Sequence, residues 1–212
     1  MSDTSLAKCI LYIENDKTLV YNFKDALNEE LPRIDSSISI RLQIAYDMEE
    51  ARKWLIQNGE RFDALMVDVM LPRNKQEREQ LDRLERKRRE ALLKLERKKD
   101  YDKDRLDDET IHLRFEIDQL DFEIEKYLDM EGGYNVLKEW AHSLDASGDK
   151  ENPRPLELPV VFWTARAMPE VREKCKSIVH KDYFKWFEKP SDELDILKEL
   201  LKMVKEKSKV SK

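Results

Sequence analysis

The sequence predicts an α/β fold, a doubly wound parallel sheet of five strands with helices on both faces. Short apolar runs alternate with apolar stripes at helical spacing along most of the 212 residues. Parallel strands need crossover connections and helices supply them, so this alternation indicates a parallel sheet covered on both faces. One highly charged segment, residues 75–128, follows the third strand and predicts an inserted antiparallel helical hairpin.

Local patterns predict the elements in chain order. Residues 9–13 are a β-branched apolar run typical of a strand buried on both faces. Residues 17–30 form a helical stripe that Asp16 caps and the stretch "LPRIDSS" ends. Apolar residues alternate with polar ones over 38–44, which predicts an edge strand. The later elements are a helix from Asp47 to Asn58-Gly59, a strand at 64–67, a helix within 130–140, a strand within 158–165, a further helix, a strand within 182–190 and an amphipathic helix from Ser191 to about Lys205.

Residues 75–128 contain two apolar stripes with the steps of three and four that form a helix–helix seam. Residues 75–99 contain eleven Lys/Arg and six Asp/Glu, whereas residues 100–129 contain four and twelve. Opposite charges favour docking of the two helices, and the polar stretch 98–110 predicts the tip between them. The stripe residues are Leu81, Leu84, Ala91 and Leu95, interrupted by Arg88, and then Leu113, Ile117, Leu120, Ile124 and Tyr127.

Composition narrows the class of protein. The net charge of -6 argues against nucleic acid as a partner, and no run of about 18 apolar residues predicts a membrane span. Cys9 and Cys175 lack metal-type spacing, and the N-terminus lacks a leader, so we expect reduced thiols in a cytoplasmic protein. The three histidines are scattered and share no ligand spacing.

Asp68 follows an apolar strand, where a carboxylate needs an explanation. A buried carboxylate is costly unless it has a partner, binds a metal or changes its pKa. The ligand site of a doubly wound sheet lies at the carboxyl ends of the strands, so residues after different strands meet there. We expect Asp68 at this edge together with residues 14–16, Thr164 and Lys189.

Four stretches in order resemble the receiver domain of bacterial two-component response regulators. They are "ILYIEND", "FDALMVDVMLP", "LPVVFWTARA" and "FEKP". The resemblance covers residues 1–74 and 129–212 and implies the strand order 2-1-3-4-5. It leaves residues 75–128 as a coiled-coil hairpin inserted before the helix that begins in "MEGGYNVLKEW".

The resemblance also implies roles for individual residues. Asp68 would accept a phosphoryl group, while Thr164 and Lys189 would bind the phosphate and Trp186 would be the aromatic residue that switches position. A carboxylate can act as nucleophile when cations neutralise the phosphate oxygens. The implied Mg²⁺ ligands are Glu14, Asn15, Asp68 and the backbone carbonyl of Met70.

One residue departs from the pattern of the family. The second acid after the first strand is replaced by Asn15, and an amide has an oxygen but no charge, so Mg²⁺ affinity is expected to fall. Whether Asp16 replaces that acid stays open.

Simpler interpretations of these residues also exist. Asp68 could cap the first hairpin helix, Lys189 could be a surface lysine, Thr164 a β-branched strand residue and Trp186 a core aromatic.

Two hypotheses for function follow. In the first, the protein is a stand-alone response regulator, because only one helix and a short tail follow the last strand. A histidine kinase or phosphotransfer protein would phosphorylate Asp68, and the hairpin would contact an effector. In the second, the protein is an inactive pseudo-receiver adaptor whose hairpin binds a partner or forms a homodimer. An independent enzyme would need a nucleophile–base pair or a Gly-rich phosphate loop, so the expected chemistry is at most phosphoryl acceptance and self-dephosphorylation at Asp68.

Overall fold

A computed structural model describes residues 6–57, 61–99, 108–145, 153–165 and 168–210 of the chain. Its centre is a five-stranded sheet in the order β2-β1-β3-β4-β5, and all neighbouring strands are parallel. The predicted doubly wound sheet and its strand order are thereby confirmed, and β2 lies at an edge as its alternating pattern indicated. The strands are β1 (Leu6–Ile13), β2 (Ile38–Ala45), β3 (Ala64–Val67), β4 (Val160–Thr164) and β5 (Phe184–Glu188).

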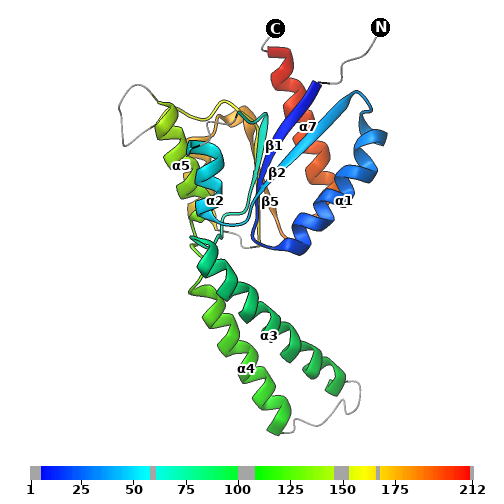
Figure 1. Cartoon of the computed structure of the whole chain (residues 1–212), viewed down its shortest axis with the longest axis vertical. Coiled ribbons are helices and arrows are strands. Elements are labelled where there is room, and N and C mark those ends of the chain that lie inside the picture. Colours follow the sequence, from blue (N-terminus) through cyan, green and yellow to red (C-terminus); the bar gives the residue numbers. More distant parts are fainter. Residues whose placement is uncertain (1–5, 58–60, 100–107, 146–152, 166–167, 211–212) are drawn as a thin grey trace.

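Helices cover both faces of the sheet and bury a separate apolar cluster on each (Figure 1). Helices α1 and α7 pack on the face that holds Tyr12 and Trp163. Helices α2, α5 and α6 pack on the opposite face, around Val67 and Phe162. The helices are α1 (Lys17–Ile34), α2 (Met48–Arg52) continued by the π-helical turn η1 (Lys53–Gln57), α3 (Lys75–Lys99), α4 (Asp108–Glu125), α5 (Gly132–Leu144), α6 (Pro169–Ile178), the 3-10 turn η2 (Lys181–Tyr183) and α7 (Glu193–Val210).

Helix α1 ends within the predicted stretch "LPRIDSS", and the end of α2 differs from the prediction. Helix α1 continues beyond Leu31-Pro32 to Ile34, because a proline in the last turn removes few hydrogen bonds while Leu31 and Ile34 still pack on the core. Helix α2 ends at Arg52 and continues as a π-helical turn that keeps Leu55 buried. The predicted end at Asn58-Gly59 lies outside the described residues.

Helices α3 and α4 form the predicted hairpin, which projects from the carboxyl edge of the sheet, at the end of the molecule opposite both termini (Figure 1). Ala91 and Leu95 pack against Leu113 and Ile117 along its seam, and Arg88, which interrupts the stripe, forms an ion pair with Asp121. A second ion pair, between Lys98 and Glu109, joins the arms near the tip. Most of the predicted tip, residues 98–110, lies outside the described part of the chain.

The two ends of the hairpin meet at its base. Leu71 and Asp129 form an antiparallel bridge in which each backbone N–H donates to the other's carbonyl, at 3.2 and 2.9 Å. The chain therefore leaves and re-enters the α/β domain at one point. This is the geometry expected of an insertion.

Candidate functional site

The candidate site lies where the chain leaves β1, β3, β4 and β5. Backbone hydrogen bonds continue the sheet past the strand ends and fix the first residue of each loop. The N–H of Glu14 donates to Ala45 (2.9 Å), that of Asp68 to Ile13 (2.8 Å) and that of Lys189 to Thr164 (2.8 Å). The parallel register thus brings together side chains that are up to 175 positions apart in sequence.

Lys189 connects two buried carboxylates. Its Nζ donates to Glu14 Oε2 and to Asp68 Oδ2, both at 2.7 Å. Glu14 is fully buried, Asp68 is 4 % exposed, and the Lys189 side chain is 13 % exposed. Two carboxylates at this depth would repel each other strongly without the ammonium between them.

Each carboxylate uses its second oxygen to accept a backbone N–H. Glu14 Oε1 accepts from Asp16 at 2.9 Å, and Asp68 Oδ1 accepts from Met70 at 3.1 Å. The cluster is therefore built from one ammonium, two carboxylates and two backbone donors. All three side chains are held in place before any ligand arrives.

The electrostatics follow from burial. Burial, reinforced by the nearby charge of Asp68, raises the pKa of Glu14 to about 8, although Lys189 acts in the opposite direction. Burial opposes the charge of Lys189, but the two carboxylates outweigh it and raise the pKa of the ammonium. The Lys189 ammonium also lies 5.6 Å from the centre of the Trp163 ring, an additional cation–π contact.

Thr164 brings a hydroxyl to the same edge. The residue is fully buried, and its Oγ1 has no hydrogen-bond partner among the described residues. A buried unpaired hydroxyl costs free energy, so its position calls for an explanation. A ligand oxygen next to Lys189 would provide the missing partner.

Asn15 and Asp16 lie toward the hairpin. Asp16 caps α1, and its Oδ1 accepts from the N–H of Thr18 at 2.7 Å, as the sequence predicted. Asn15 lines a hollow of about 400 Å³ between this loop and α3, and no described hydrogen bond joins its side chain to Glu14, Asp68 or Lys189. The Asp16 side chain therefore caps α1, and the structure shows no contact of it with Asp68 or Lys189 among the described residues.

Trp186 is packed on the core side of β5. It is partly buried, and its ring stacks on Phe162 with centroids 5.7 Å apart. This packing matches the core interpretation of the residue, and the switching role stays a prediction.

Two of the simpler interpretations are wrong. Asn74, and not Asp68, caps the first hairpin helix, because its Oδ1 accepts from the N–H of Glu77 at 3.0 Å. Lys189 is not a surface lysine, because both its charge partners and most of its own side chain are buried.

Sequence reasoning missed Gly133, which supports the site from α5. Its N–H donates to the carbonyl of Val69 at 3.0 Å, and a Cβ at this position would lie 2.2 Å from the carbonyl oxygen of Asp68. Only a residue without a side chain permits this approach. The signal was visible in the "GG" of "MEGGYNV", but a contact across 65 positions cannot be read from it.

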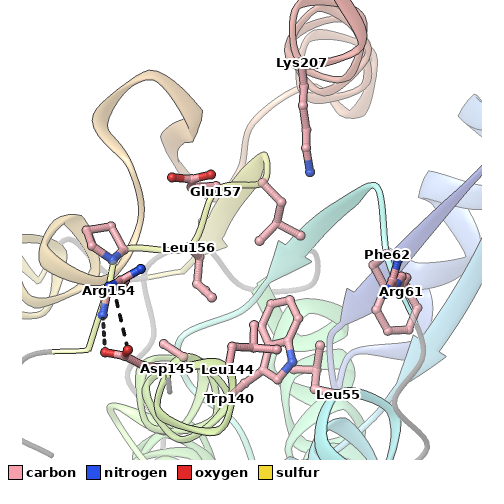
Figure 2. Close-up of a pocket in the computed structure, with 13 residues that line it drawn as sticks. Leu55, Arg61, Phe62, Trp140, Leu144, Asp145, Arg154, Leu156, Glu157 and Lys207 are labelled. Atoms are coloured by element: carbon pink, nitrogen blue, oxygen red, sulfur yellow. Dashed lines mark hydrogen bonds and ion pairs between the residues drawn. The ribbon is translucent and has the colours of Figure 1, made fainter. Parts of the chain in front are cut away.

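A larger hollow of about 810 Å³ lies at the opposite edge of the sheet, beside residues that precede β3 and β4. Figure 2 shows Lys207 of α7 pointing into it, with Trp140 and Leu55 on the opposite side and Arg154 paired to Asp145. None of the site residues predicted from the sequence lines this hollow. We therefore place the candidate site at the carboxyl edge.

The carboxyl edge offers a limited set of ligands for Mg²⁺. The described residues contain no group of three or more His, Cys, Asp or Glu side chains arranged to hold a metal ion. Mg²⁺ is, however, commonly held by one or two carboxylates together with water and phosphate oxygens, and Glu14 and Asp68 supply two buried carboxylates side by side. These residues fit Mg²⁺, with Asn15 in place of the second acid that the family has after the first strand.

Comparison with solved structures identifies the fold. A response regulator receiver domain protein from Clostridium thermocellum is similar over 96 % of this chain and 98 % of its own, with 12 % identity and a TM-score of 0.51. The BeF3-activated DrrB receiver domain aligns over 93 % of this chain and 99 % of its own, with 13 % identity and a TM-score of 0.44. No protein-family model matches the chain, and no curated protein does so either.

The first of these similarities, together with the strand order, defines the class of fold. The chain has a receiver-like, doubly wound α/β fold with a helical hairpin added after β3. In the part of the chain that the structure describes, no helix is long and apolar enough to cross a membrane.

Proposed function

We propose that the protein is a receiver in phosphorelay signalling, which accepts a phosphoryl group on Asp68 and transmits the signal through protein contacts. The observation that supports this most strongly is the convergence of Asp68, Lys189 and the unpaired hydroxyl of Thr164 at one edge of a receiver-like sheet. The donor would be a histidine kinase or a phosphotransfer protein. The surface that contacts an effector protein would include the hairpin.

The chemistry is a phosphoryl transfer between two side chains. A carboxylate oxygen of Asp68 attacks the phosphorus of a phosphohistidine, and an acyl phosphate forms on Asp68 as the P–N bond breaks. The electron pair of that bond stays on the leaving imidazole, which takes a proton from solvent. Lys189 already contacts Asp68 Oδ2 and would move its charge to the phosphate oxygens. The hydroxyl of Thr164 would donate to another of these oxygens.

A bound Mg²⁺ would add positive charge beside the transferred phosphate. Glu14 and Asp68 would hold it, with Asn15 and the Met70 carbonyl as further oxygen ligands implied by the resemblance. The missing second acid predicts that phosphorylation of this chain needs more Mg²⁺ than that of a receiver with two acids.

The experiment is phosphorylation by a small donor. The protein is incubated with Mg²⁺ and acetyl phosphate, and intact-mass spectrometry looks for one added phosphoryl group. We expect the added mass in the natural chain and in Asp195→Asn, which changes an exposed acid of α7, and its loss in Asp68→Asn. If Asp68→Asn takes up as much phosphate as the natural chain, Asp68 is not the acceptor.

A second function is favoured by Asn15 and by the closed pair of Lys189 with both carboxylates. Here the protein is a pseudo-receiver adaptor, its sheet a scaffold and its hairpin the binding element. This function predicts no uptake from acetyl phosphate at any Mg²⁺ concentration. If Asn15→Asp then creates uptake at Asp68, loss of the acid is the cause of inactivity.

A further inference from the structure

Helix α4 has an exposed apolar stripe opposite the seam that it shares with α3. Ile111, Phe115 and Phe122 lie at i, i+4 and i+11, which places them on one face of the helix. Their exposed fractions are 52 %, 60 % and 62 %. The buried seam residues of α4 lie on the other face, so α4 is apolar on two opposite sides.

This stripe is surrounded by negative charge. Helix α4 contains seven Asp and Glu residues and one Arg over its 18 residues. Asp118 lies within the stripe, between Phe115 and Phe122. At the end of the stripe, the Nζ of Lys126 is 4.5 Å from the centre of the Phe122 ring. A partner must therefore combine apolar side chains with positive charge.

From this stripe and its charge, we propose that the outer face of α4 binds a basic amphipathic helix of another protein. Two aromatic side chains about four-tenths buried within the chain are suitable anchors, since helices dock through apolar residues at i, i+4 and i+7. Asp118 would pair with a Lys or Arg that flanks the apolar residues of the partner. Helix α3 already docks on α4 in this way, with a basic helix facing an acidic one.

The small area and the acidic charge of the stripe favour a weakly bound basic helix over a stable dimer of this chain. Three side chains exposed by this much offer roughly 300 Å² of apolar surface, whereas a stable interface needs about 800 Å² from each partner. In a second copy the complementary basic surface is the outer face of α3, with Arg86, Leu93 and Arg97. Contact between α4 of one copy and α3 of the next is heterologous, and such contacts form a ring or an open chain of copies and not a two-fold dimer.

This inference extends the proposed function by naming a class of partner, and it is independent of phosphoryl transfer. Failure of Asp68 to accept phosphate leaves peptide binding unaffected, and failure to bind peptide leaves the mass test unaffected. The two outcomes are therefore distinguishable.

The test is titration of a labelled model peptide, followed by fluorescence anisotropy. The peptide is a helix of about 18 residues with leucines at i, i+4, i+7 and i+11 and lysines on both flanks of this stripe. A second peptide has glutamates in place of the lysines. We expect the basic peptide to bind the full-length protein and the acidic peptide not to bind. The affinity for the basic peptide should be several-fold lower at about 500 mM salt than at about 50 mM salt.

The variant Phe115→Ala/Phe122→Ala should weaken binding of the basic peptide at least tenfold, because truncating anchor residues commonly has this effect. Tyr21→Ala is the matched control, since Tyr21 on α1 is an exposed aromatic residue at 64 %. Circular dichroism checks that all three proteins are equally helical. Equal loss in Tyr21→Ala, or no loss in the double variant, would overturn the proposal.

Sedimentation velocity tests whether a second copy of this chain covers the outer face of α4. We expect the natural chain to sediment as a monomer at concentrations where the peptide binds. A dimer that the double variant abolishes would mean that a second copy, and not a separate basic helix, covers this face.

Discussion

Replacing Lys189 with methionine should strongly destabilise the fold. The change keeps most of the side-chain volume and removes the ammonium that contacts Glu14 and Asp68 at 2.7 Å each. What remains is the buried Asp68 carboxylate beside Glu14, which must take up a proton because burial raises its pKa and Lys189 no longer opposes this. The substitution therefore measures how much of the free energy of unfolding depends on the Lys189 contacts.

The magnitude follows from the geometry. At an effective dielectric constant of about 20, each contact at 2.7 Å is worth roughly 6 kcal/mol of Coulomb energy. Most of this is offset by the desolvation of three charges, so the measured loss is expected near 3–5 kcal/mol, the usual range when one partner of a buried ion pair is removed. A domain of this size is stable by only about 5–15 kcal/mol.

The assay is urea unfolding at neutral pH, followed by circular dichroism and tryptophan fluorescence. Lys185→Met is the matched control, because Lys185 is also on β5 and pairs with Glu199 at 2.7 Å, with both side chains partly exposed. An exposed pair should contribute about 1 kcal/mol or less. The slope of free energy against urea must stay unchanged for the comparison to hold.

A second substitution separates charge from packing. Adding Glu14→Gln to Lys189→Met removes one carboxylate and keeps an oxygen for the N–H of Asp16. We expect it to restore at least about 1 kcal/mol of the lost stability. The reasoning is refuted if Lys189→Met costs no more than Lys185→Met, or if Glu14→Gln destabilises both backgrounds equally.

Three more predictions follow from the packing. Gly133→Ala should lower the free energy of unfolding in urea by about 3 kcal/mol, because the new Cβ would lie 2.7 Å from Val67 Cγ1 and even closer to the Asp68 carbonyl oxygen. Gly132→Ala, whose Cβ would have contacts of 3.1 Å, should lower it less, and equal losses would contradict this. Deleting residues 75–128 behind a short Gly-Ser linker should leave a domain that melts cooperatively, because the Leu71–Asp129 bridge already joins the two ends, and a non-cooperative melt would mean that the hairpin is part of the core. Cys9 and Cys175 are buried, and burial raises the pKa of the Cys175 thiol, so both should react with a thiol reagent in urea but not in the native protein. Fast reaction of either thiol in the native protein would disprove this packing.

The fold and the position of the site were predictable because they depend on periodicity. A run such as residues 9–13 can only be buried on both faces, and the rule for parallel sheets then brings the residues after each strand to one edge. Nothing more was needed to place Asp68 and Lys189 together. The hairpin was predictable for the same reason, since its seam repeats at fixed steps.

The unpredicted features depend on single contacts between distant residues. The closed pair of Lys189 with both carboxylates, the approach of Gly133 to the Asp68 backbone and the continuation of α1 through Pro32 each require coordinates. The outer face of α4 was also missed. Its stripe of Ile111, Phe115 and Phe122 overlaps in sequence with the seam residues, and the two patterns can be separated only when the seam is seen to be filled.

Hydrogen bonds join the base of the hairpin to the start of α2. The carbonyls of Pro72 and Arg73 accept the N–H groups of Met48 and Glu49 at the start of α2, at 3.0 and 3.1 Å. On α3, Arg78 pairs with Asp47 at 3.0 Å.

A further contact joins α3 to the first residue of α1, since Lys17 pairs with Asp82 at 2.5 Å. Helix α3 is therefore joined to the start of α1 and to the loop after β2, and only residues 69–74 separate it from Asp68. A new group on Asp68 would disturb the hydrogen bonds that its oxygens accept from Lys189 and from the Met70 N–H. Met70 directly precedes the bridge at Leu71. A change of charge at Asp68 thus has a short, hydrogen-bonded route to the base of the hairpin, which is why we expect the hairpin and not the opposite edge of the sheet to report the state of the site.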